Sequence, residues 1–476
     1  MGYYIHFINI ILASIIIFFE RKKPLYTLFW IMVLIFTSYF GFIVYLFFGL
    51  SFKKRIQLKK HYSRSLLKKT KFMNYVQYHR LVKIERIIKS LEVGANSKLT
   101  LSNKLRSYNV GKDFFNDLYA DLEKATTTIH MEYFIFYDDE FGSKFYDLLI
   151  KKAQEGVKVL LIVDGAGTWG ISRRRIRQLR ENGVAFKVFF PSYLPFLKIG
   201  NLRANYRDHK KLTIIDSNIT YTGGYNIGLD YISEGRLGHW EDFGVRVEGE
   251  STIEFEKEFM IDWAFLGGKE EDYLPFIHRL SEKEKNIKDL SPADILPIQV
   301  FSSAPIYEVH TVRNNIIELI MSAQKSICIA TPYFVPDEPV FDTLKMAAIA
   351  GVDVKVIIPC KPDHLFVYWA NQSYIAELLN YGVKFYRYQN GFIHTKMTLV
   401  DSEVSCVGTA NFDYRSFYQN FELNLNIYNK SENIKIRKIF DSLLSSSKEI
   451  NPLEFRERKK IEIFKESICR LFSPIL

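Results

Sequence analysis

Two stretches of eight residues, "HKKLTIID" at positions 209–216 and "HTKMTLVD" at positions 394–401, share one spacing of polar residues. Each contains a histidine, a lysine two residues later and an aspartate five residues after the lysine. One such match arises by chance in roughly a few per cent of chains of this composition, so a single motif is a weak signal. The sequence that flanks both stretches therefore decides whether they carry chemistry.

The flanking sequence repeats in the same order around the two stretches. The matching segments are "IHMEYFIF" (129–136) with "ICIATPYFVP" (327–336), "EGVKVLLIVDG" (155–165) with "AGVDVKVIIPC" (350–360), and "ENGVAFKVF" (181–189) with "NYGVKFYRY" (380–388). In each copy, strand-like runs alternate with helix-like runs, which indicates βαβ units and a largely parallel sheet covered by helices. The repeat predicts an α/β fold with two pseudo-symmetric copies of one unit.

A turn of small residues and an asparagine follow each eight-residue motif at the same distance. The first turn is "GGYN", with Gly223, Gly224 and Asn226, and the second is "GTAN", with Gly408, Thr409 and Asn411. Two motifs at equivalent positions of a repeat, with the same asparagine after each, are far rarer than one motif alone. We therefore interpret both as parts of one site.

These residue types suit the cleavage and transfer of a phosphodiester. A neutral imidazole can attack phosphorus, and a second imidazole on the opposite face can give a proton to the departing oxygen. Lysine and asparagine side chains can hold the non-bridging oxygens. The predicted catalytic residues are His209, Lys211, Asp216, His394, Lys396 and Asp401. Asn226 and Asn411 are predicted to bind the substrate phosphate; for the two aspartates, a structural role at the strand end is the alternative.

A catalytic imidazole also needs a partner that orients its second nitrogen. The candidates are Asp242 in "HWEDF" (239–243) and Glu422 in "NFELN" (420–424), each about thirty residues after its histidine. Carboxylates are common on protein surfaces, so an ordinary solvated role is the alternative for both.

Two apolar runs at the N-terminus, Tyr3–Phe19 and Leu25–Leu50, are separated only by "ERKKP". About 20 apolar residues in a helix cross the hydrocarbon layer of a bilayer. The first run lacks the basic start of a signal peptide. We therefore predict a transmembrane hairpin over residues 1–50, with a buried pair of soluble helices as the alternative.

A basic segment, "SFKKRIQLKKHYSRSLLKKTKF" (51–72), follows the second run, and no acidic residue occurs before Glu85. Lysine and arginine next to a span remain in the cytoplasm, so we predict a multi-pass protein of the cell membrane with its catalytic domains on the cytoplasmic side. The formal net charge of +11 and this segment also predict contact with an anionic phospholipid membrane. A solvated linker is the alternative for residues 60–90.

The predicted organisation has four parts: a transmembrane hairpin (1–50), a basic juxtamembrane linker with helices (51–105), a first α/β domain (106–290) and a second α/β domain (291–476) that ends in an amphipathic helix. That last helix could lie on the membrane or pack on the catalytic core. The four cysteines form no close pairs, so no metal site is predicted from them.

The paired motifs resemble those of the phospholipase D superfamily. Together with "GTANFDYRSF" (408–417), "QNFELN" (419–424), "TPYFVPDE" (331–338) and the apolar N-terminus, they are similar to bacterial cardiolipin synthases of the phospholipase D type. The first copy departs from the second in having "HWED" where the second has "NFEL". The resemblance implies two phospholipase D-like α/β sandwich domains and a site without metal or cofactor.

The resemblance also implies the reaction. A phosphatidyl group would pass from one phosphatidylglycerol to another through a covalent phosphohistidine, giving cardiolipin and glycerol. We assign His209 as the nucleophile and His394 as the acid and base, although the near-symmetry of the copies leaves the reverse open.

Three other functions are compatible with parts of the sequence. A hydrolytic phospholipase D would use the same residues with water as the acceptor, and a membrane-anchored phosphodiesterase or nuclease would use the basic charge. A catalytically silent scaffold conflicts with two intact motifs. We expect phosphatidylglycerol and the membrane as partners and no nucleic acid, because the basic excess is concentrated beside the apolar runs. Assembly into a homo-oligomer stays open.

Overall fold

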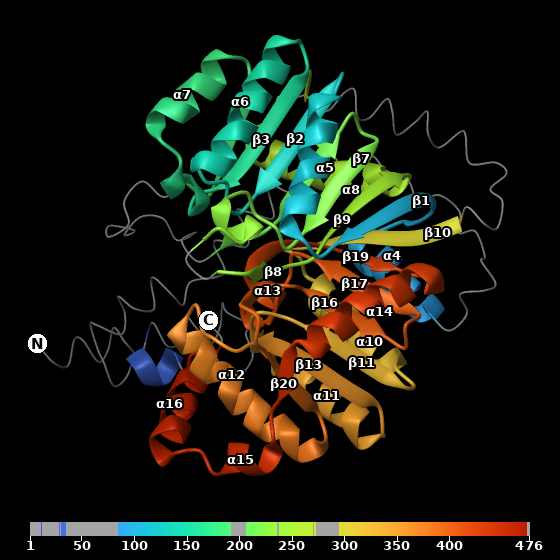
Figure 1. Ribbon diagram of the computed structural model, residues 1–476, viewed down its shortest axis with the longest axis vertical. Helices are drawn as coiled ribbons and strands as arrows, with labels where there is room; N and C mark the ends of the chain where they lie inside the picture. The colour runs from blue at the N-terminus through green and yellow to red at the C-terminus, as the bar shows by residue number, and fades with distance from the viewer. Residues whose placement is uncertain are drawn as a thin grey trace, which may run out of the picture. The chain divides into compact units, whose positions relative to one another are not determined.

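The computed structural model describes residues 84–191, 206–235, 238–269, 271–272 and 295–473, together with residues 11, 28 and 30–34. The chain divides into two compact units, residues 1–71 with 192–205 and residues 72–191 with 206–476. All the elements described below belong to the second unit, which contains both motifs (Figure 1).

The first half of this unit alternates strands and helices as the repeat predicts. After helix α4 (Glu85–Ala95) its elements are β1 (Leu99–Tyr108), α5 (Gly111–Glu123), β2 (Thr128–Tyr133), α6 (Glu140–Gln154), β3 (Lys158–Asp164), η4 (Gly167–Gly170), α7 (Arg173–Glu181), β4 (Ala185–Phe189), β5 (Arg207–Asp208), β6 (Lys211–Ile215), β7 (Ile219–Gly223), η6 (Leu229–Ile232), β8 (Trp240–Glu241), β9 (Gly244–Gly249) and α8 (Ser251–Phe265).

The second half repeats this series. Its elements are β10 (Ile295–Ser303), α10 (Thr311–Ser322), β11 (Ser326–Ala330), β12 (Phe334–Val335), α11 (Glu338–Ile349), β13 (Asp353–Pro359), α12 (Leu365–Leu378), η8 (Leu379–Tyr381), β14 (Lys384–Tyr388), β15 (Phe392–Ile393), β16 (Met397–Val400), β17 (Val404–Gly408), β18 (Phe412–Asp413), α13 (Tyr414–Tyr418), β19 (Asn420–Ile427), α14 (Lys430–Ser445), β20 (Ser447–Glu449), α15 (Pro452–Arg456) and α16 (Lys460–Leu471).

One continuous sheet runs through both halves. Its strand order is β20-β14-β13-β11-β16-β17-β19-β10-β1-β9-β7-β6-β2-β3-β4, and β5 pairs with β19 off this path. Apart from β20, the order reads the same from either side of the β10–β1 junction, where these two strands pair antiparallel. The sheet topology therefore confirms two pseudo-symmetric copies.

Helices cover both faces of each half (Figure 1). Helices α5, α6 and α7 pack with the strands of the first core, and helices α10, α11 and α12 do the same in the second. On the opposite face lie α8 in the first half and α14 in the second. Strands such as β3, which reads "KVLLIVD", are buried almost throughout because helices cover the sheet on both sides.

Two short strands cross from one half to the other. Strand β5, just before His209, pairs with β19 of the second half. Strand β15, just before His394, pairs with β8 of the first half. Each histidine is therefore fixed by backbone hydrogen bonds to the opposite copy, which no pattern within one repeat indicates.

The α/β class and the two repeated halves are confirmed, whereas the domain bounds 106–290 and 291–476 stay predictions. The expected largely parallel sheet is wrong: only β2–β3–β4 and β11–β13–β14 pair parallel, and the other strands in the order above pair antiparallel. The apolar runs at 3–19 and 25–50 lie outside the described residues, apart from residues 11, 28 and 30–34. Within the part of the chain that the structure describes, no helix is both long enough and apolar enough to cross a bilayer.

Candidate active site

His209 lies where β5 turns into β6 at one edge of the sheet. Its backbone N–H donates to the carbonyl of Phe421 at 2.9 Å. The next strand residue, Lys211, faces Tyr133 of β2, and Tyr133 faces Val163 of β3. His209 therefore lies at the carboxyl ends of β2 and β3, the edge at which open α/β sheets bind ligands.

His394 occupies the equivalent position in the second half. Its backbone N–H donates to the carbonyl of Glu241 at 2.7 Å. Met397 of β16 faces Ala330 of β11, and Ala330 faces Ile357 of β13, so His394 lies at the carboxyl ends of β11 and β13. Both motifs therefore occupy matching edges of their sheets.

Each histidine contacts a carboxylate of the other half. The Nδ1 of His209 lies 3.1 and 3.0 Å from the two carboxylate oxygens of Glu422, and the Nδ1 of His394 lies 2.6 Å from Oδ2 of Asp242. The two predicted acids do meet histidines, but pairing each with the histidine that precedes it in the same repeat is wrong. The crossing strands β5 and β15 carry each histidine to the opposite copy's acid.

The turn after each motif fits its carboxylate. A Cβ atom on Gly224 would lie 1.8 Å from Oδ1 of Asp242. Only glycine at position 224 therefore leaves room for the Asp242 side chain. The second copy has Thr409 there, and its Oγ1 donates to Glu422 at 2.6 Å. Asn420 donates a further hydrogen bond to Glu422 at 3.1 Å. The difference between "GGYN" and "GTAN" therefore corresponds to the different acids that they support.

Both imidazoles are buried and neutral at pH 7. Burial is the largest cause of a pKa of about 4 at His209 and at His394. Lys211 and Lys396 lower the pKa of each histidine further, whereas its carboxylate partner raises it. The contacts of Nδ1 with Glu422 and Asp242 assign the tautomer with the proton on Nδ1, which leaves the lone pair of Nε2 available. The Nζ of Lys396 also lies 3.0 Å from Nδ1 of His394, and the shorter contact with Asp242, 2.6 Å, decides the assignment there.

The two motif lysines complete the cluster. The Nζ of Lys211 donates to the carbonyl of His209 at 2.6 Å, and the Nζ of Lys396 donates to the carbonyl of His394 at 2.5 Å. Burial lowers the pKa of Lys211 to about 7 and that of Lys396 to about 8, although Glu422 and Asp242 raise both. A bound anion favours the protonated form of both lysines, so together with the neutral imidazoles they form a site suited to an anion.

These lysine pKa values predict the pH dependence of the free enzyme. A lysine attracts a phosphodiester only when it is protonated, and the protonated fraction falls as pH rises above the pKa. We expect kcat/KM to fall roughly tenfold or more between pH 8 and pH 10, because this ratio reports the groups of the free enzyme. Lys211→Arg and Lys396→Arg, which keep the charge, serve as controls in the same assay. A flat profile from pH 6 to pH 10 would contradict the assignment.

The motif aspartates lie away from the histidines. Asp216 accepts hydrogen bonds from the backbone of Thr126, Thr127 and Thr128 at 2.7–2.9 Å. Asp401 accepts equivalent bonds from residues 324–326 at 2.8 Å. Each aspartate directly follows the strand that starts at, or one residue after, the motif lysine. It therefore lies at the opposite end of that strand, roughly 15 Å from the lysine along an extended chain. These hydrogen bonds hold the start of the neighbouring strand and favour the structural role, while a catalytic role stays a prediction for both aspartates.

The two asparagines differ in their contacts. Asn226 accepts from the backbone N–H of Ile135 at 3.1 Å and donates to the hydroxyl of Tyr231 at 2.7 Å. The buried Oδ1 of Asn411 has no hydrogen-bond partner among the described residues. A role in phosphate binding stays a prediction for both.

Aromatic rings border the histidines, which the sequence did not predict. Phe134 packs edge-on against His209 with ring centroids 5.1 Å apart, and Trp240 lies 5.0 Å from His394. Such rings exclude water and strengthen the electrostatic interactions within the site.

A buried ionic network behind His209 was also missed. Lys210, the middle residue of "HKK", forms an ion pair with Asp262 of α8, and its Nζ lies 3.9 Å from Glu132. Burial alone would lower the pKa of Lys210, but Asp262 and Glu132 outweigh it and raise the pKa above its ordinary value. The second motif has Thr395 at the equivalent position, so comparison of the two copies gave no reason to expect a buried ion pair there.

Two copies of one α/β unit, each contributing a histidine and a lysine to a shared edge, define a phospholipase D-like protein. Among solved structures, a phosphatidylserine synthase from Haemophilus influenzae is similar in fold, with a TM-score of 0.63 and 14% identity over 83% of this chain and 100% of that chain.

Sequence comparison resolves the class further. The family described as "Cardiolipin synthase, PLD-like domain" matches residues 118–263 and 316–444, and the family described as "Phospholipase_D-nuclease N-terminal" matches residues 7–49. A cardiolipin synthase from Staphylococcus aureus (strain Mu50) is 36% identical over 98% of this chain and 95% of its own length. One from Clostridium perfringens (strain SM101) is 37% identical over 96% and 95%. The chain belongs to the cardiolipin synthase family of phospholipase D-like proteins.

Proposed function

We propose that this protein is a cardiolipin synthase, a phosphatidyltransferase that joins two phosphatidylglycerol molecules and releases glycerol. The observation that carries the proposal is the pair of crossed histidine–carboxylate contacts, His209 with Glu422 and His394 with Asp242, beside two buried lysines. The similarity to cardiolipin synthases along nearly the full chain supports the choice of lipid substrate.

In the first step, Nε2 of His209 attacks the phosphorus of the first phosphatidylglycerol. The N–P bond forms as the P–O bond to the glycerol headgroup breaks, and protonated His394 gives its proton to the departing oxygen. In the substrate complex, Asp242 and the bound phosphodiester both favour the protonated form of His394, so its pKa rises above the value in the free enzyme. Glycerol leaves, and a phosphatidyl-histidine remains.

In the second step, now-neutral His394 takes the proton from a hydroxyl of the second phosphatidylglycerol. The resulting oxygen nucleophile attacks phosphorus, the N–P bond breaks, and cardiolipin forms with His209 restored. Lys211 and Lys396 stabilise the charge on the non-bridging oxygens in both transition states, because their buried ammonium groups need no reorganisation.

The products formed from phosphatidylglycerol by the purified full-length protein test the proposal. With chelator present, we expect cardiolipin and glycerol in equal amounts, because the histidines supply both nucleophile and acid. Phosphatidic acid as the main product would show water as the acceptor and overturn the synthase assignment. Cleavage of DNA at a rate comparable to lipid turnover would favour a nuclease.

We also propose that residues 1–50 form the transmembrane hairpin and that the catalytic halves lie on the cytoplasmic side of the cell membrane. Support comes from the length of the two apolar runs, the basic segment after them and the family match over residues 7–49. Protease accessibility of the C-terminus in right-side-out and inverted vesicles tests the orientation; cleavage only in right-side-out vesicles would contradict it.

A further inference from the structure

Large apolar side chains are exposed on both halves at the sheet edge that carries the histidines. In the first half, Trp169 of η4 follows strand β3 and is 63% exposed. In the second half, Leu365 and Phe366 begin α12, which follows the equivalent strand β13, and are 65% and 62% exposed. The carboxyl ends of β3 and β13 lie at the edge of the sheet that carries His209 and His394, which we call the histidine edge. All three apolar residues follow these strand ends and therefore emerge at the histidine edge.

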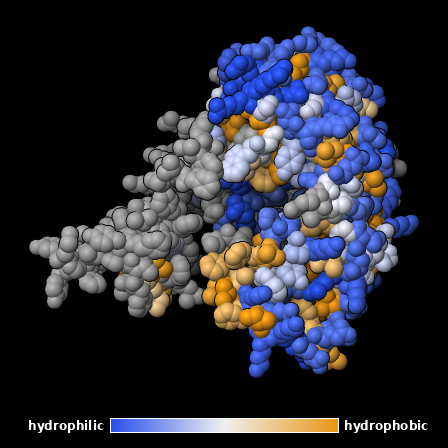
Figure 2. All heavy atoms as spheres, turned by 60° about the vertical axis from the view of Figure 1, so that its left-hand side comes forward, coloured by the Kyte–Doolittle hydropathy of each residue, from blue (hydrophilic) through white to orange (hydrophobic). Residues whose placement is uncertain are grey.

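Basic residues accompany these apolar side chains. Arg173, Arg174 and Arg177 at the start of α7 are exposed just after Trp169, and Lys361 is exposed just before Leu365. Tryptophan beside arginine and lysine is typical of segments that lie at the interface of an anionic bilayer. Figure 2 shows a hollow in this side of the molecule, with apolar atoms gathered below it and a smaller group above it.

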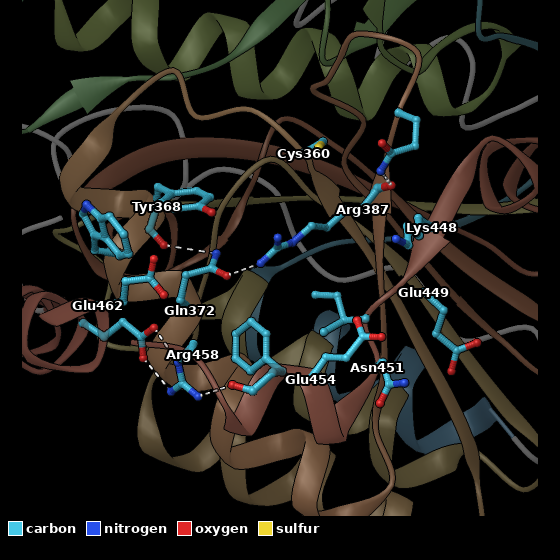
Figure 3. Close-up of a pocket in the computed structure, with 15 residues that line it drawn as sticks. Cys360, Tyr368, Gln372, Arg387, Lys448, Glu449, Asn451, Glu454, Arg458 and Glu462 are labelled. Carbon is cyan, nitrogen blue, oxygen red and sulfur yellow. Dashed lines mark hydrogen bonds and ion pairs between the residues drawn. The ribbon is translucent and has the colours of Figure 1, made fainter. Parts of the chain in front are cut away.

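Helix α16 adds an apolar surface next to α12. Its carboxylate Glu466 faces inward: this side chain is only 2% exposed and accepts two hydrogen bonds from Arg458 at 2.7 Å, beside a cavity of about 380 Å³ (Figure 3). The Nζ of Lys465 lies over the ring of Trp369 of α12. Outward, Ile461 and Phe464 are exposed. A helix that buries a carboxylate and exposes isoleucine and phenylalanine presents its apolar side to another apolar phase.

The shape of the lipid substrate indicates what covers this apolar surface. If the proposed function holds, the phosphate of each lipid must reach the histidines while its acyl chains stay in the bilayer. The histidine edge must then lie at the level of the headgroups. We propose that Trp169, Leu365 and Phe366 are interfacial anchors that insert into an anionic bilayer on both sides of the active site, with the exposed side of α16 extending this surface.

The far edge of the sheet supplies a matched control. Met346 and Ile349 lie at the C-terminal end of α11, just before β13 begins, so they occupy the edge opposite the histidines. They are 62% and 57% exposed, close to the values of Phe366 and Leu365. Exposure of apolar side chains therefore does not distinguish Met346 and Ile349 from Leu365 and Phe366. The two pairs differ in the edge of the sheet at which they lie.

Fluorescence quenching by lipid tests the insertion directly. The full-length protein is reconstituted in phosphatidylglycerol vesicles with or without brominated acyl chains, as Phe366→Trp and as Met346→Trp in parallel. We expect the added fluorescence at position 366 to be quenched at least about twofold and that at position 346 to be unchanged. The same comparison between the unsubstituted protein and Trp169→Phe isolates the signal of Trp169. Equal quenching at 366 and 346, or none at 366 and 169, would overturn the inference.

Turnover supplies the second readout. Leu365→Ser with Phe366→Ser is expected to lower cardiolipin formation from vesicles about tenfold or more and to leave turnover of dissolved short-chain phosphatidylglycerol unchanged. Met346→Ser with Ile349→Ser should change neither. Self-association that is abolished by the 365/366 variant, without lipid quenching, would assign the surface to a second copy of the chain. Failure of the unsubstituted protein to form cardiolipin would contradict the proposed function, while the quenching result would still decide the docking surface.

Discussion

Replacing His209 or His394 by alanine is expected to reduce cardiolipin formation by at least roughly 10⁴-fold, because each step needs both a nucleophile and a proton carrier. A donor lipid with p-nitrophenol as its leaving group separates the two roles. This leaving group departs without a proton, so His394→Ala should still release one equivalent of p-nitrophenolate in a burst. His209→Ala should release none.

The control for this experiment is His364→Ala, which removes an exposed imidazole whose described contacts are with Asp363 and Tyr333 rather than with the motif residues. Its turnover of dissolved short-chain lipid should equal that of the unsubstituted protein. A burst from His209→Ala together with none from His394→Ala would reverse the two roles. Full activity in either variant would refute the two-histidine mechanism.

The crossed carboxylates give the second large effect. Glu422→Gln and Asp242→Asn are each expected to lower turnover by roughly 10² to 10⁴-fold, because a histidine without its carboxylate loses the correct tautomer and orientation. The structure predicts which step each variant impairs. Asp242→Asn should keep the p-nitrophenolate burst, since Asp242 supports His394, whereas Glu422→Gln should lose it with His209.

Pairing within one repeat would give the opposite pattern, with the burst lost in Asp242→Asn and kept in Glu422→Gln. Glu338→Gln, an exposed carboxylate on α11, is the matched control and should leave both turnover and burst unchanged. The melting temperature of each variant shows whether a loss of activity reflects unfolding.

The α/β class and the repeat were predictable because both depend on the alternation of apolar and polar residues within short segments. Buried strands such as "KVLLIVD" and the helices between them recur in both copies. The βαβ pattern predicted only the parallel pairs β2–β3–β4 and β11–β13–β14, and the antiparallel strands that join them in the sheet were not predicted. The histidines and lysines were predictable for the same reason, since one copy validates the other.

The pairing of acids with histidines was not predictable from those patterns. It depends on β5 and β15, two-residue strands that cross between halves and have no periodicity to read. The network of Lys210 with Asp262 was hidden because the second motif has Thr395 at that position. Asp216 and Asp401 accept hydrogen bonds from backbone N–H groups next to a neighbouring strand. Every residue type except proline has such a group, so the sequence gives no sign of these contacts.

The covalent intermediate tests the central claim most directly. The full-length protein is mixed with phosphatidylglycerol, quenched in alkali to preserve a phosphorus–nitrogen bond, digested, and its peptides are measured by mass spectrometry. The account predicts a phosphatidyl group on the peptide that contains His209, absent from His209→Ala and chased into cardiolipin when more phosphatidylglycerol is added. A phosphatidyl group on His394 instead, or an adduct that water alone consumes to phosphatidic acid, would contradict it.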